Sequence, residues 1–528
     1  MHASTSLPAT CYRHRSRDGK KGEFAGMSEV QRRAAGFVIP RADARSWGEP
    51  LYRDALYRLV DHGVGGIGVF LGGLEETARM IDDLRSRGGR RLLFAADYEH
   101  GLPMRLDGGV AFPRAMALGR TLPGITEHIA AAIAEEARAI GVTWNFAPVC
   151  DINANPNNPI INTRSFGEDA VTVAQHAVAY VRGTQRERVM ACAKHVPGHG
   201  DTVVDSHVAL PSIEISEQLA IEREFVPFRA AIEAGVASVM MGHIIVPFLD
   251  AKRPASLSSR VINDLVRNTW GFDGLVTTDA LDMRAITGTY TSGEAAVLAF
   301  EAGNDVLLLP EDPLAAIDAL AAAIASGHID EARCAGSEAR WEAARRFVRP
   351  LPSDAKRPPV DLAAHAQMAL KAADAAIRVV GDTSLLPLSN DQAYAAFAII
   401  DETDADAATT WCHYLAQATE GNSDFAFIDE TISDGDLASM CEGTTDASVV
   451  LFALFGRATA YRGVLGGRTR TAEIMQRLAQ GKPSIVIACG SPYGIEGLPA
   501  TLTMHAYSDT TPSLAATVLR LIGRPANG

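Results

Sequence analysis

The sequence has few cysteines and no long uninterrupted apolar run. Only 7 of its 528 residues are cysteines, and they are scattered, odd in number and free of Cys-x-x-Cys spacing. This pattern argues against a disulfide framework or a zinc finger, and it leads us to expect reduced thiols and a cytoplasmic location. No apolar stretch reaches about 18 residues and the N-terminal segment is polar, so we expect neither a membrane span nor a signal peptide.

Positive charge is also scarce relative to negative charge. The 49 Lys and Arg residues oppose 63 Asp and Glu residues, for a formal net charge of −14. An acidic chain repels phosphate backbones, so we expect no nucleic-acid partner. With 47% hydrophobic and 21% charged residues, the composition excludes wholesale disorder and a coiled-coil rod. The length then indicates one large domain and one smaller domain.

We expect residues 1–26 to be a disordered extension, because they show almost no apolar periodicity. Residues 27–345 alternate short aliphatic runs with Ala-rich amphipathic stretches, as strands and helices do in turn. The eight strand candidates are 35–39, 66–71, 92–98, 143–149, 190–195, 238–245, 275–280 and 305–309. Eight such units predict an α/β fold with a closed (β/α)₈ barrel, and an open doubly wound sheet is the alternative.

A linker and a second domain follow the predicted barrel. Residues 346–362 are rich in proline and charge, which indicates a linker. Residues 363–528 contain a helix and further strand candidates at 395–400, 425–428, 448–455 and 484–489, typical of a smaller α/β domain. This part has no Gly-x-Gly-x-x-Gly and no phosphate loop, so we assign it no nucleotide and expect no cofactor.

Polar side chains stand at or just after the ends of five candidate strands. They are Asp97 and Glu99, Asp151 and Asn153, Lys194 and His195, His243, and Asp279. The C-terminal ends of parallel barrel strands meet at one mouth, so these side chains are expected to converge on one pocket. A single Asp at a strand end is usually a helix N-cap, but five similar strand ends indicate a binding site.

The loop after the fifth candidate strand holds the densest polar group, with three histidines and two aspartates in thirteen residues. Glycine and proline lie between the polar residues, so the loop would not hold metal ligands rigidly. Neither a thiolate nor a His-Glu-x-x-His helix is nearby in the sequence, so we expect no metal. In an extended loop, Asp205 and His207 project to the same side. The carboxylate can then hold the imidazole as a general acid and base. The alternative is a loop-anchoring hydrogen bond without chemistry.

A second polar group runs from Gly274 to Met283. Asp279 closes the seventh candidate strand and should therefore lie at the mouth. A carboxylate at the bottom of a polar pocket can attack an electrophilic carbon, which in glycosidases is the anomeric carbon. Asp282, by contrast, is typical of the first turn of a helix.

These motifs together resemble glycoside hydrolase family 3, and they occur in the family's order across residues 30 to 310. The stretches that carry the resemblance are Asp97-Tyr98-Glu99-His100-Gly101, Asn145 to Asp151, Arg164-Ser165-Phe166-Gly167, Lys194 to Thr202, Asp205-Ser206-His207 and Gly274 to Met283. The resemblance implies a TIM-like barrel followed by an α/β sandwich domain. The Asp-x-His pair is similar to that of the β-N-acetylglucosaminidase branch.

The resemblance also implies roles for individual residues. Asp279 matches the nucleophile, His207 the acid/base and Asp205 its partner. The positions that hold the terminal sugar correspond to Asp97, Arg105, Arg164, Lys194 and His195. Charged groups suit this task because they form stronger hydrogen bonds to sugar hydroxyls than neutral groups do.

The implied activity is a retaining, exo-acting β-N-acetylglucosaminidase that acts on cell-wall or chitin-type fragments. An imidazole acid/base is neutral in its base form, so phosphate could replace water and make the protein a glycoside phosphorylase. A β-glucosidase and a non-catalytic sugar-binding protein are further alternatives. Val196 replaces an aromatic residue of the family pattern, and Tyr98 and His100 replace Gln and Gly, which would alter the floor and rim of the sugar pocket.

Overall fold

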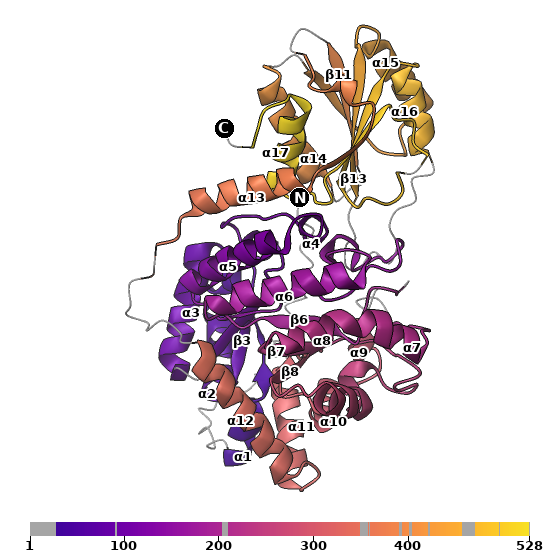
Figure 1. Ribbon diagram of the computed structural model, residues 1–528. Coiled ribbons are helices and arrows are strands. Elements are labelled where there is room, and N and C mark those ends of the chain that lie inside the picture. Colours follow the sequence, from indigo (N-terminus) through magenta and orange to yellow (C-terminus); the bar gives the residue numbers. More distant parts are fainter. Residues whose placement is uncertain are drawn as a thin grey trace.

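The computed structural model shows two bodies, a large barrel and a smaller sheet domain at one end of it (Figure 1). It describes residues 28–526 except 90–91, 203–209, 349–356, 358, 390–392, 401–403, 421–422, 457–469 and 496. The expected extension over 1–26 lies outside these residues, as does part of the expected linker.

The barrel is built from short parallel strands that are buried on both sides, as expected for a parallel sheet covered by helices. The strands are β1 (Val38–Ile39), β2 (Arg41–Asp43), β3 (Gly66–Phe70), β4 (Leu93–Ala96), β5 (Trp144–Asn145), β6 (Cys192–Val196), β7 (Ser238–Met241), β8 (Leu275–Thr278) and β9 (Leu307–Leu308). Only Pro40, which has no N–H to donate, separates β1 from β2, and the two act as one interrupted strand.

The strand pairings follow one another around the barrel. One sheet has the order β2-β3-β4-β5, a second β6-β7-β8, and β1 pairs with β9. Parallel bridges from Trp144 to Met190 and from Val149 to Lys194 join β5 to β6, and a bridge from Thr277 to Val306 joins β8 to β9. Followed in order, these pairings return to the first strand. The predicted α/β fold, with parallel strands arranged like a TIM barrel, is therefore confirmed.

Helices cover the outside of the barrel between successive strands. The main ones are α2 (Pro50–Asp61), α3 (Leu74–Gly88), α5 (Pro123–Ile140), α6 (Ala170–Arg186), α8 (Phe225–Glu233), α10 (Ser292–Ala302), α11 (Pro313–Ala325) and α12 (Glu331–Val348), with a π-helical segment at Arg260–Thr269. Helix α5 shows how sequence sets their limits. Proline occupies its first position, and Gly141 ends it with a left-handed φ of 99°.

The end of the barrel where the strands begin is held by a buried charge network. Asp305, which precedes β9, is fully buried and accepts hydrogen bonds from Arg267 Nη2 at 2.5 Å and Arg340 Nη1 at 3.3 Å. The Trp341 indole also donates to the Asp305 carbonyl at 2.9 Å. These contacts fix α12 to the barrel, far along each strand from the ends that carry the candidate site residues.

The second domain is a six-stranded sheet with helices on both faces, which confirms the predicted α/β sandwich. The strand order is β10-β15-β14-β13-β11-β12, and only the β10–β15 pair is antiparallel. Its strands are β10 (Arg378–Gly381), β11 (Tyr394–Ile399), β12 (Ser423–Ile428), β13 (Val449–Gly456), β14 (Ser484–Gly490) and β15 (Leu502–His505). Its helices are α13 (Leu362–Ala376), α14 (Ala405–Ala418), α15 (Asp434–Gly443), α16 (Thr471–Ala479) and α17 (Thr511–Leu521).

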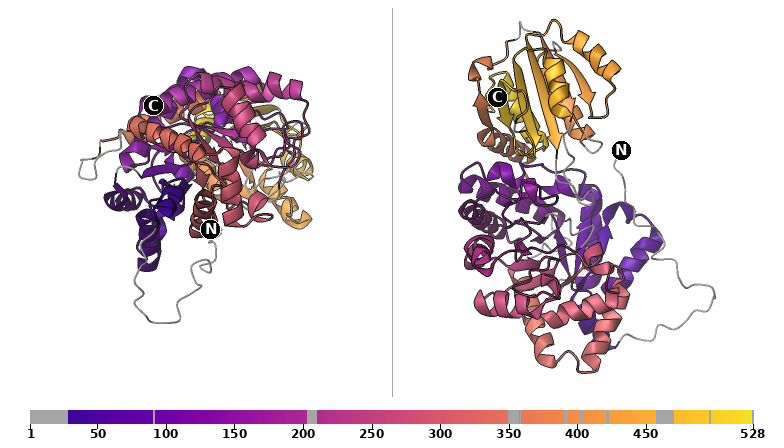
Figure 2. Two further views of the ribbon diagram at one scale, coloured as in Figure 1. Left: turned by 90° about the horizontal axis from the view of Figure 1, so that it is seen from below. Right: turned by 90° about the vertical axis from the view of Figure 1, so that its right-hand side faces the viewer.

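The two bodies meet through specific polar contacts, at the end of the barrel seen beneath the sheet domain in Figure 2. Arg114, which precedes helix α4 (Ala115–Leu118), forms a short ion pair with Asp509, and its backbone N–H donates to Ser508 Oγ at 3.1 Å. His365 Nδ1 lies 2.8 Å from Glu136 Oε1 on α5. The second domain is thus fixed to the barrel by polar and charged groups that are largely buried.

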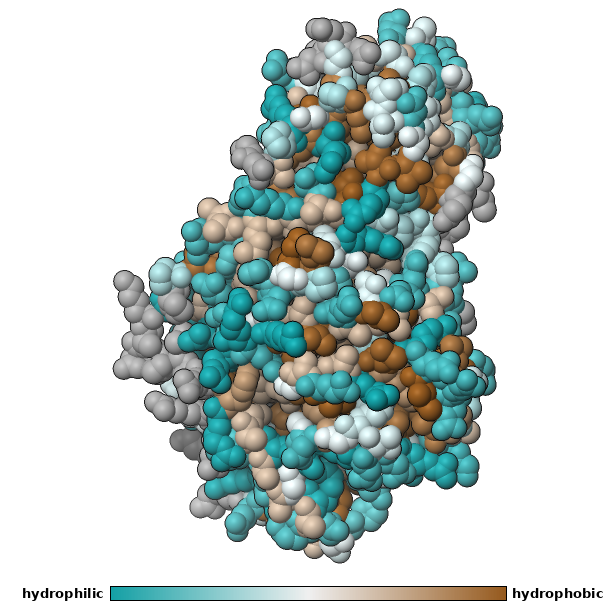
Figure 3. Space-filling view, in the orientation of Figure 1, coloured by the Kyte–Doolittle hydropathy of each residue, from teal (hydrophilic) through white to brown (hydrophobic). Residues whose placement is uncertain are grey.

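The outer surface shown in Figure 3 mixes hydrophilic and hydrophobic residues, and the hydrophobic ones form small groups rather than one continuous band. Within the described residues, the helices are all too short or too polar to cross a lipid bilayer.

Candidate active site

A charged cluster lies at the mouth of the barrel, centred on Lys194. Its side chain is 2% exposed, and its Nζ donates to Asp97 Oδ1 and to Glu99 Oε1, both at 2.8 Å. Asp97 directly follows β4, whereas Lys194 lies within β6. Arg105 Nη2 donates to the second oxygen of Asp97, Oδ2, at 2.8 Å. The barrel therefore brings together three candidate sugar-binding residues from distant parts of the sequence.

Arg164 extends this cluster from the loop after β5. Its Nε donates to Glu99 Oε2 at 3.0 Å and its Nη2 to Glu99 Oε1 at 2.8 Å, which makes a bidentate ion pair. Its Nη1 also donates to the Ile160 carbonyl at 3.1 Å. Its Nη2 lies 3.5 Å from His195 Nε2. Glu99, which the sequence analysis placed at the mouth without giving it a role, is the residue that links Arg164 to Lys194.

The charges in this cluster stabilise one another. Burial raises the pKa of Asp97 and of Glu99, but Lys194 and the neighbouring arginines lower both pKa values below their usual range. Burial alone would lower the pKa of Lys194, but the two carboxylates raise it above its usual value. All these side chains are therefore ionised at neutral pH, and they form a fixed array of donors and acceptors.

Asp151 holds His195 and the start of the following loop. It is fully buried, and its Oδ2 lies 2.7 Å from His195 Nδ1 while its Oδ1 accepts the backbone N–H of His199 at 2.8 Å. Burial raises the pKa of Asp151, but His195 lowers it below its usual value. The other ring nitrogen of His195, Nε2, lies on the side of Arg164.

The loop after β6 packs tightly on the loop after β5. A Cβ at Gly200 would lie 1.5 Å from the Ile152 carbonyl oxygen, so only glycine fits there. His199 Nδ1 lies 2.8 Å from Thr202 Oγ1, and burial lowers the pKa of His199 to about 4, so its imidazole is neutral. The chain then enters residues 203–209. Asp205 and His207 lie outside the described residues, and their roles stay predictions.

Asp279 directly follows β8. Its N–H donates to the Met241 carbonyl at 2.9 Å, and its Oδ1 accepts the N–H of Ala280 at 2.8 Å. His243, which is fully buried, lies beside this turn with Nε2 2.9 Å from the Ala280 carbonyl. The side chain of Asp279 is only partly buried, so part of it faces the solvent.

Asp279 lies at the same end of the barrel as the cluster. Its N–H donates to the carbonyl of Met241, the last residue of β7. Met241 in turn pairs with Val196, the last residue of β6, which is the strand that carries Lys194. The candidate nucleophile and the sugar-binding candidates therefore lie around the same part of the barrel.

The structure thus brings together six of the eight residues to which the sequence analysis gave a role, namely Asp97, Arg105, Arg164, Lys194, His195 and Asp279. Their partners Glu99 and Asp151 were expected at the same mouth from their positions at strand ends, but neither was given a role. In the described part of the chain, no three His, Cys, Asp or Glu side chains are arranged as metal ligands.

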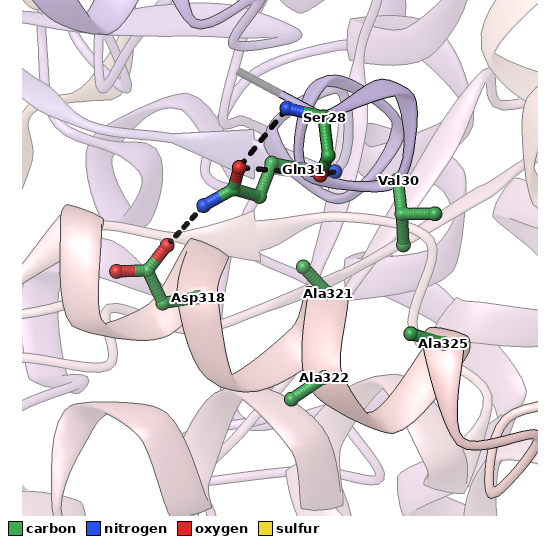
Figure 4. Close-up of a pocket in the computed structure, with 7 residues that line it drawn as sticks. All are labelled: Ser28, Val30, Gln31, Asp318, Ala321, Ala322 and Ala325. Atoms are coloured by element: carbon green, nitrogen blue, oxygen red, sulfur yellow. Dashed lines mark hydrogen bonds between the residues drawn. The ribbon is translucent and has the colours of Figure 1, made fainter. Parts of the chain in front are cut away.

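A separate surface hollow lies between helix α1 (Glu29–Ala35) and α11 (Figure 4). It measures about 490 Å³, and three of its seven lining residues are alanines, with Gln31 donating to Asp318 at 2.9 Å. None of the residues described above lines it. A single charged group, already bonded to Gln31, offers little chemistry, so we assign this hollow no role.

The structure combines a parallel barrel, a group of charged side chains at the mouth of this barrel, and a three-layer α/β domain. This is the combination of fold and site that the sequence motifs indicated. A family profile described as "Glycosyl hydrolase family 3 N terminal domain" matches residues 52–342. The chain belongs to glycosyl hydrolase family 3.

Two curated relatives and one solved structure are similar to this chain. "Beta-hexosaminidase A" of Pseudoalteromonas piscicida is 32% identical over 297 residues, which are 51% of this chain and 50% of the relative. "Beta-N-acetylglucosaminidase/beta-glucosidase" of Cellulomonas fimi is 35% identical over 262 residues, 47% of this chain and 46% of the relative. The chain therefore spans about half the length of these two relatives.

The solved structure covers nearly the whole chain. It is a glycoside hydrolase family 3 β-N-acetylglucosaminidase from Paenibacillus sp. str. FPU-7, 30% identical, with a TM-score of 0.82. The match covers 94% of this chain and 97% of that chain, so the likeness includes both domains.

Proposed function

We propose that the protein is a retaining, exo-acting β-N-acetylglucosaminidase that removes terminal N-acetylglucosamine from cell-wall or chitin-type fragments. The observation that carries the proposal is the grouping of Asp279 with a charged cluster at one barrel mouth. The names of the three similar proteins, which are a β-hexosaminidase and β-N-acetylglucosaminidases, support the choice of sugar. Family membership supports a glycosidic bond as the bond that breaks.

The proposed chemistry is a double displacement. The carboxylate of Asp279 attacks the anomeric carbon while His207 protonates the leaving oxygen, and a glycosyl ester with Asp279 forms. His207 then takes a proton from water, which attacks the same carbon and releases the sugar and the free carboxylate. In this proposal Asp205 orients and stabilises the imidazolium of His207.

The terminal sugar is held by Asp97, Arg105, Arg164, Lys194 and His195 in this proposal. Lys194 and His195 are buried, and Asp151 closes the space behind His195 with no exposed surface. The fixed charges also fit a pyranose, because they form strong hydrogen bonds to its hydroxyls without first having to be ordered.

A panel of aryl β-glycosides tests the proposal. We expect the N-acetylglucosaminide to be cleaved with a higher kcat/KM than the glucoside or the xyloside, with free sugar as the product. A preference for the glucoside would instead identify a β-glucosidase, an activity that also stands in the name of the Cellulomonas fimi relative. No cleavage of any member of the panel would leave a sugar-binding protein as the better explanation.

Adding phosphate separates hydrolysis from phosphorolysis. An imidazole base carries no negative charge, so it repels phosphate less than a carboxylate base would. Sugar 1-phosphate formed in phosphate buffer would show a phosphorylase, whereas free sugar alone supports the hydrolase.

Two further expectations from the sequence remain proposals. We retain the boundaries 27–345 for the barrel, 346–362 for the linker and 363–528 for the second domain, because each body has its own buried apolar cluster. We also retain the cytoplasm as the location, because Cys150, Cys192, Cys334, Cys412 and Cys441 are free thiols in the described residues.

A further inference from the structure

The loop that carries Asp151 and Arg164 is folded back on itself. The N–H of Asn153 donates to the Gly167 carbonyl at 2.9 Å, and Asn153 Oδ1 accepts the N–H of Asn162 at 3.0 Å. Ser165 Oγ donates to the Asp151 carbonyl at 2.6 Å. The two ends of the loop are therefore adjacent, and any group that holds both ends sets the position of what lies between them.

One side chain of the second domain contacts both ends of this loop. Tyr493 lies in the segment after β14, and its hydroxyl donates to Glu168 Oε1 at 2.5 Å. The same hydroxyl accepts a hydrogen bond from Asn153 Nδ2 at 2.9 Å. Burial raises the pKa of Tyr493, and so does the bond to Glu168, so the hydroxyl keeps its proton at neutral pH. No other single atom of the second domain bridges Asn153 and Glu168 in the described residues.

We propose that Tyr493 is a positioning residue through which the second domain sets the affinity of the barrel for the terminal sugar. Its hydroxyl holds loop 151–168 by both ends, and the loop places Arg164 against Glu99. The identity of the bound group as a sugar rests on the proposed function, whereas the positioning of the loop by Tyr493 does not.

The geometry predicts an effect on binding rather than on the chemical step. Arg164 reaches Glu99 through two hydrogen bonds, so a small displacement of the loop would disturb a bidentate contact that depends on orientation. Asp279 follows β8 on a separate sheet segment and is held by Met241 and Ala280. The nucleophile should therefore keep its position when the loop moves.

Loss of the hydroxyl should leave the two domains docked. Arg114 and Asp509 form an ion pair across the same interface, with exposed side-chain fractions of 15% and 6%. Met116, Ala117, Ala376 and Tyr507 form a shared apolar cluster beside it. A Tyr493→Phe variant retains all of these contacts as well as the aromatic ring.

Tyr394 provides a matched control. It lies on β11 of the same domain, it is buried, and its hydroxyl has no hydrogen-bond partner in the described residues. Tyr394→Phe therefore removes a buried hydroxyl without removing a contact to the loop.

The first measurement is steady-state kinetics with an aryl N-acetylglucosaminide, together with inhibition by free N-acetylglucosamine. For Tyr493→Phe we expect KM and the inhibition constant to rise about threefold to tenfold, because the hydrogen bonds that hold the two ends of the loop are lost. The kcat value should stay within about twofold of the original. Glu168→Ala should raise KM and the inhibition constant by a similar factor. Combining Tyr493→Phe with Glu168→Ala should raise the two constants little beyond the values of either single variant. Tyr394→Phe should change none of these constants.

The second measurement is amide hydrogen exchange over residues 153–168, which requires no activity. We expect faster exchange in Tyr493→Phe and unchanged exchange in Tyr394→Phe. Unchanged exchange in Tyr493→Phe would overturn the proposal, and so would a loss of kcat at constant KM. A wild-type protein that cleaves no glycoside, but whose loop exchange depends on Tyr493, would refute the proposed function and retain the positioning role.

Discussion

Replacing Lys194 by methionine removes the cation at the centre of the site while keeping a side chain of similar length. Its Nζ bonds to Asp97 and Glu99 at 2.8 Å each, and 2% of the side chain is exposed. Removing one partner of a buried ion pair costs about 3–5 kcal/mol, because a charge is left buried without compensation. Arg105 and Arg164 still face the two carboxylates, so we expect a loss near the lower limit, about 3 kcal/mol of unfolding free energy.

The loss should depend on pH in a defined direction. In the wild type the pKa values of Asp97 and Glu99 lie below their usual range, so both remain ionised from about pH 5 to pH 8 and stability is insensitive to their protonation there. Without Lys194, the upward effect of burial on the two carboxyl pKa values is no longer offset. The pKa of either Asp97 or Glu99 should then rise above its value in the unfolded chain. A group of that kind destabilises the protein as pH increases through its folded pKa. The deficit should therefore be larger at pH 8 than at pH 5.

Urea unfolding of both proteins at several pH values measures this deficit directly. Lys252→Met is the control, because Lys252 is exposed and its side chain is in no ion pair in the described residues. A Lys194→Met protein as stable as the wild type, or a deficit of equal size at every pH, would contradict the charge network described above.

Three other substitutions test separate parts of the barrel. Glu224 lies just before α8 and accepts a hydrogen bond from Arg223 Nε at 2.6 Å. Burial raises the pKa of Glu224 from 4.5 to about 7, so its contribution to stability should fall as pH increases across that range. Urea unfolding of Glu224→Gln should lack this decline, which amounts to about 3 kcal/mol. Gly200→Ala would place a Cβ against the Ile152 carbonyl, and we expect at least about a tenfold loss of kcat/KM together with a lower melting temperature. Arg164→Lys keeps the charge but loses the bidentate pair with Glu99, so KM should rise about tenfold while kcat changes less.

The sequence was sufficient to predict the fold because each strand leaves a local signal. The eight barrel strands are short aliphatic runs, and the polar residues that follow them mark the end at which a site can form. Asp97 and Asp279 could be placed at one mouth on this ground alone. Strand β15, in contrast, carries Thr503 and His505 at partly exposed positions, and its mixed composition gave no comparable signal.

Contacts between distant segments were not predictable in this way. The pairing of Glu99 with Arg164 depends on how the loop after β5 folds back over the mouth, which no periodic pattern records. Tyr493 and Asp509 reach the barrel only because the second domain docks in one orientation. That orientation is set by packing across the interface, so the residues it brings near the site could be identified only from the structure.

Covalent trapping tests the central claim most directly. A slow fluorinated N-acetylglucosaminide should inactivate the protein and leave one sugar ester on the peptide that contains Asp279, as identified by mass spectrometry after proteolysis. Asp279→Ala should show neither the label nor turnover. A label on a different carboxylate, or full activity in Asp279→Ala, would contradict the assignment of Asp279 as the nucleophile of this site.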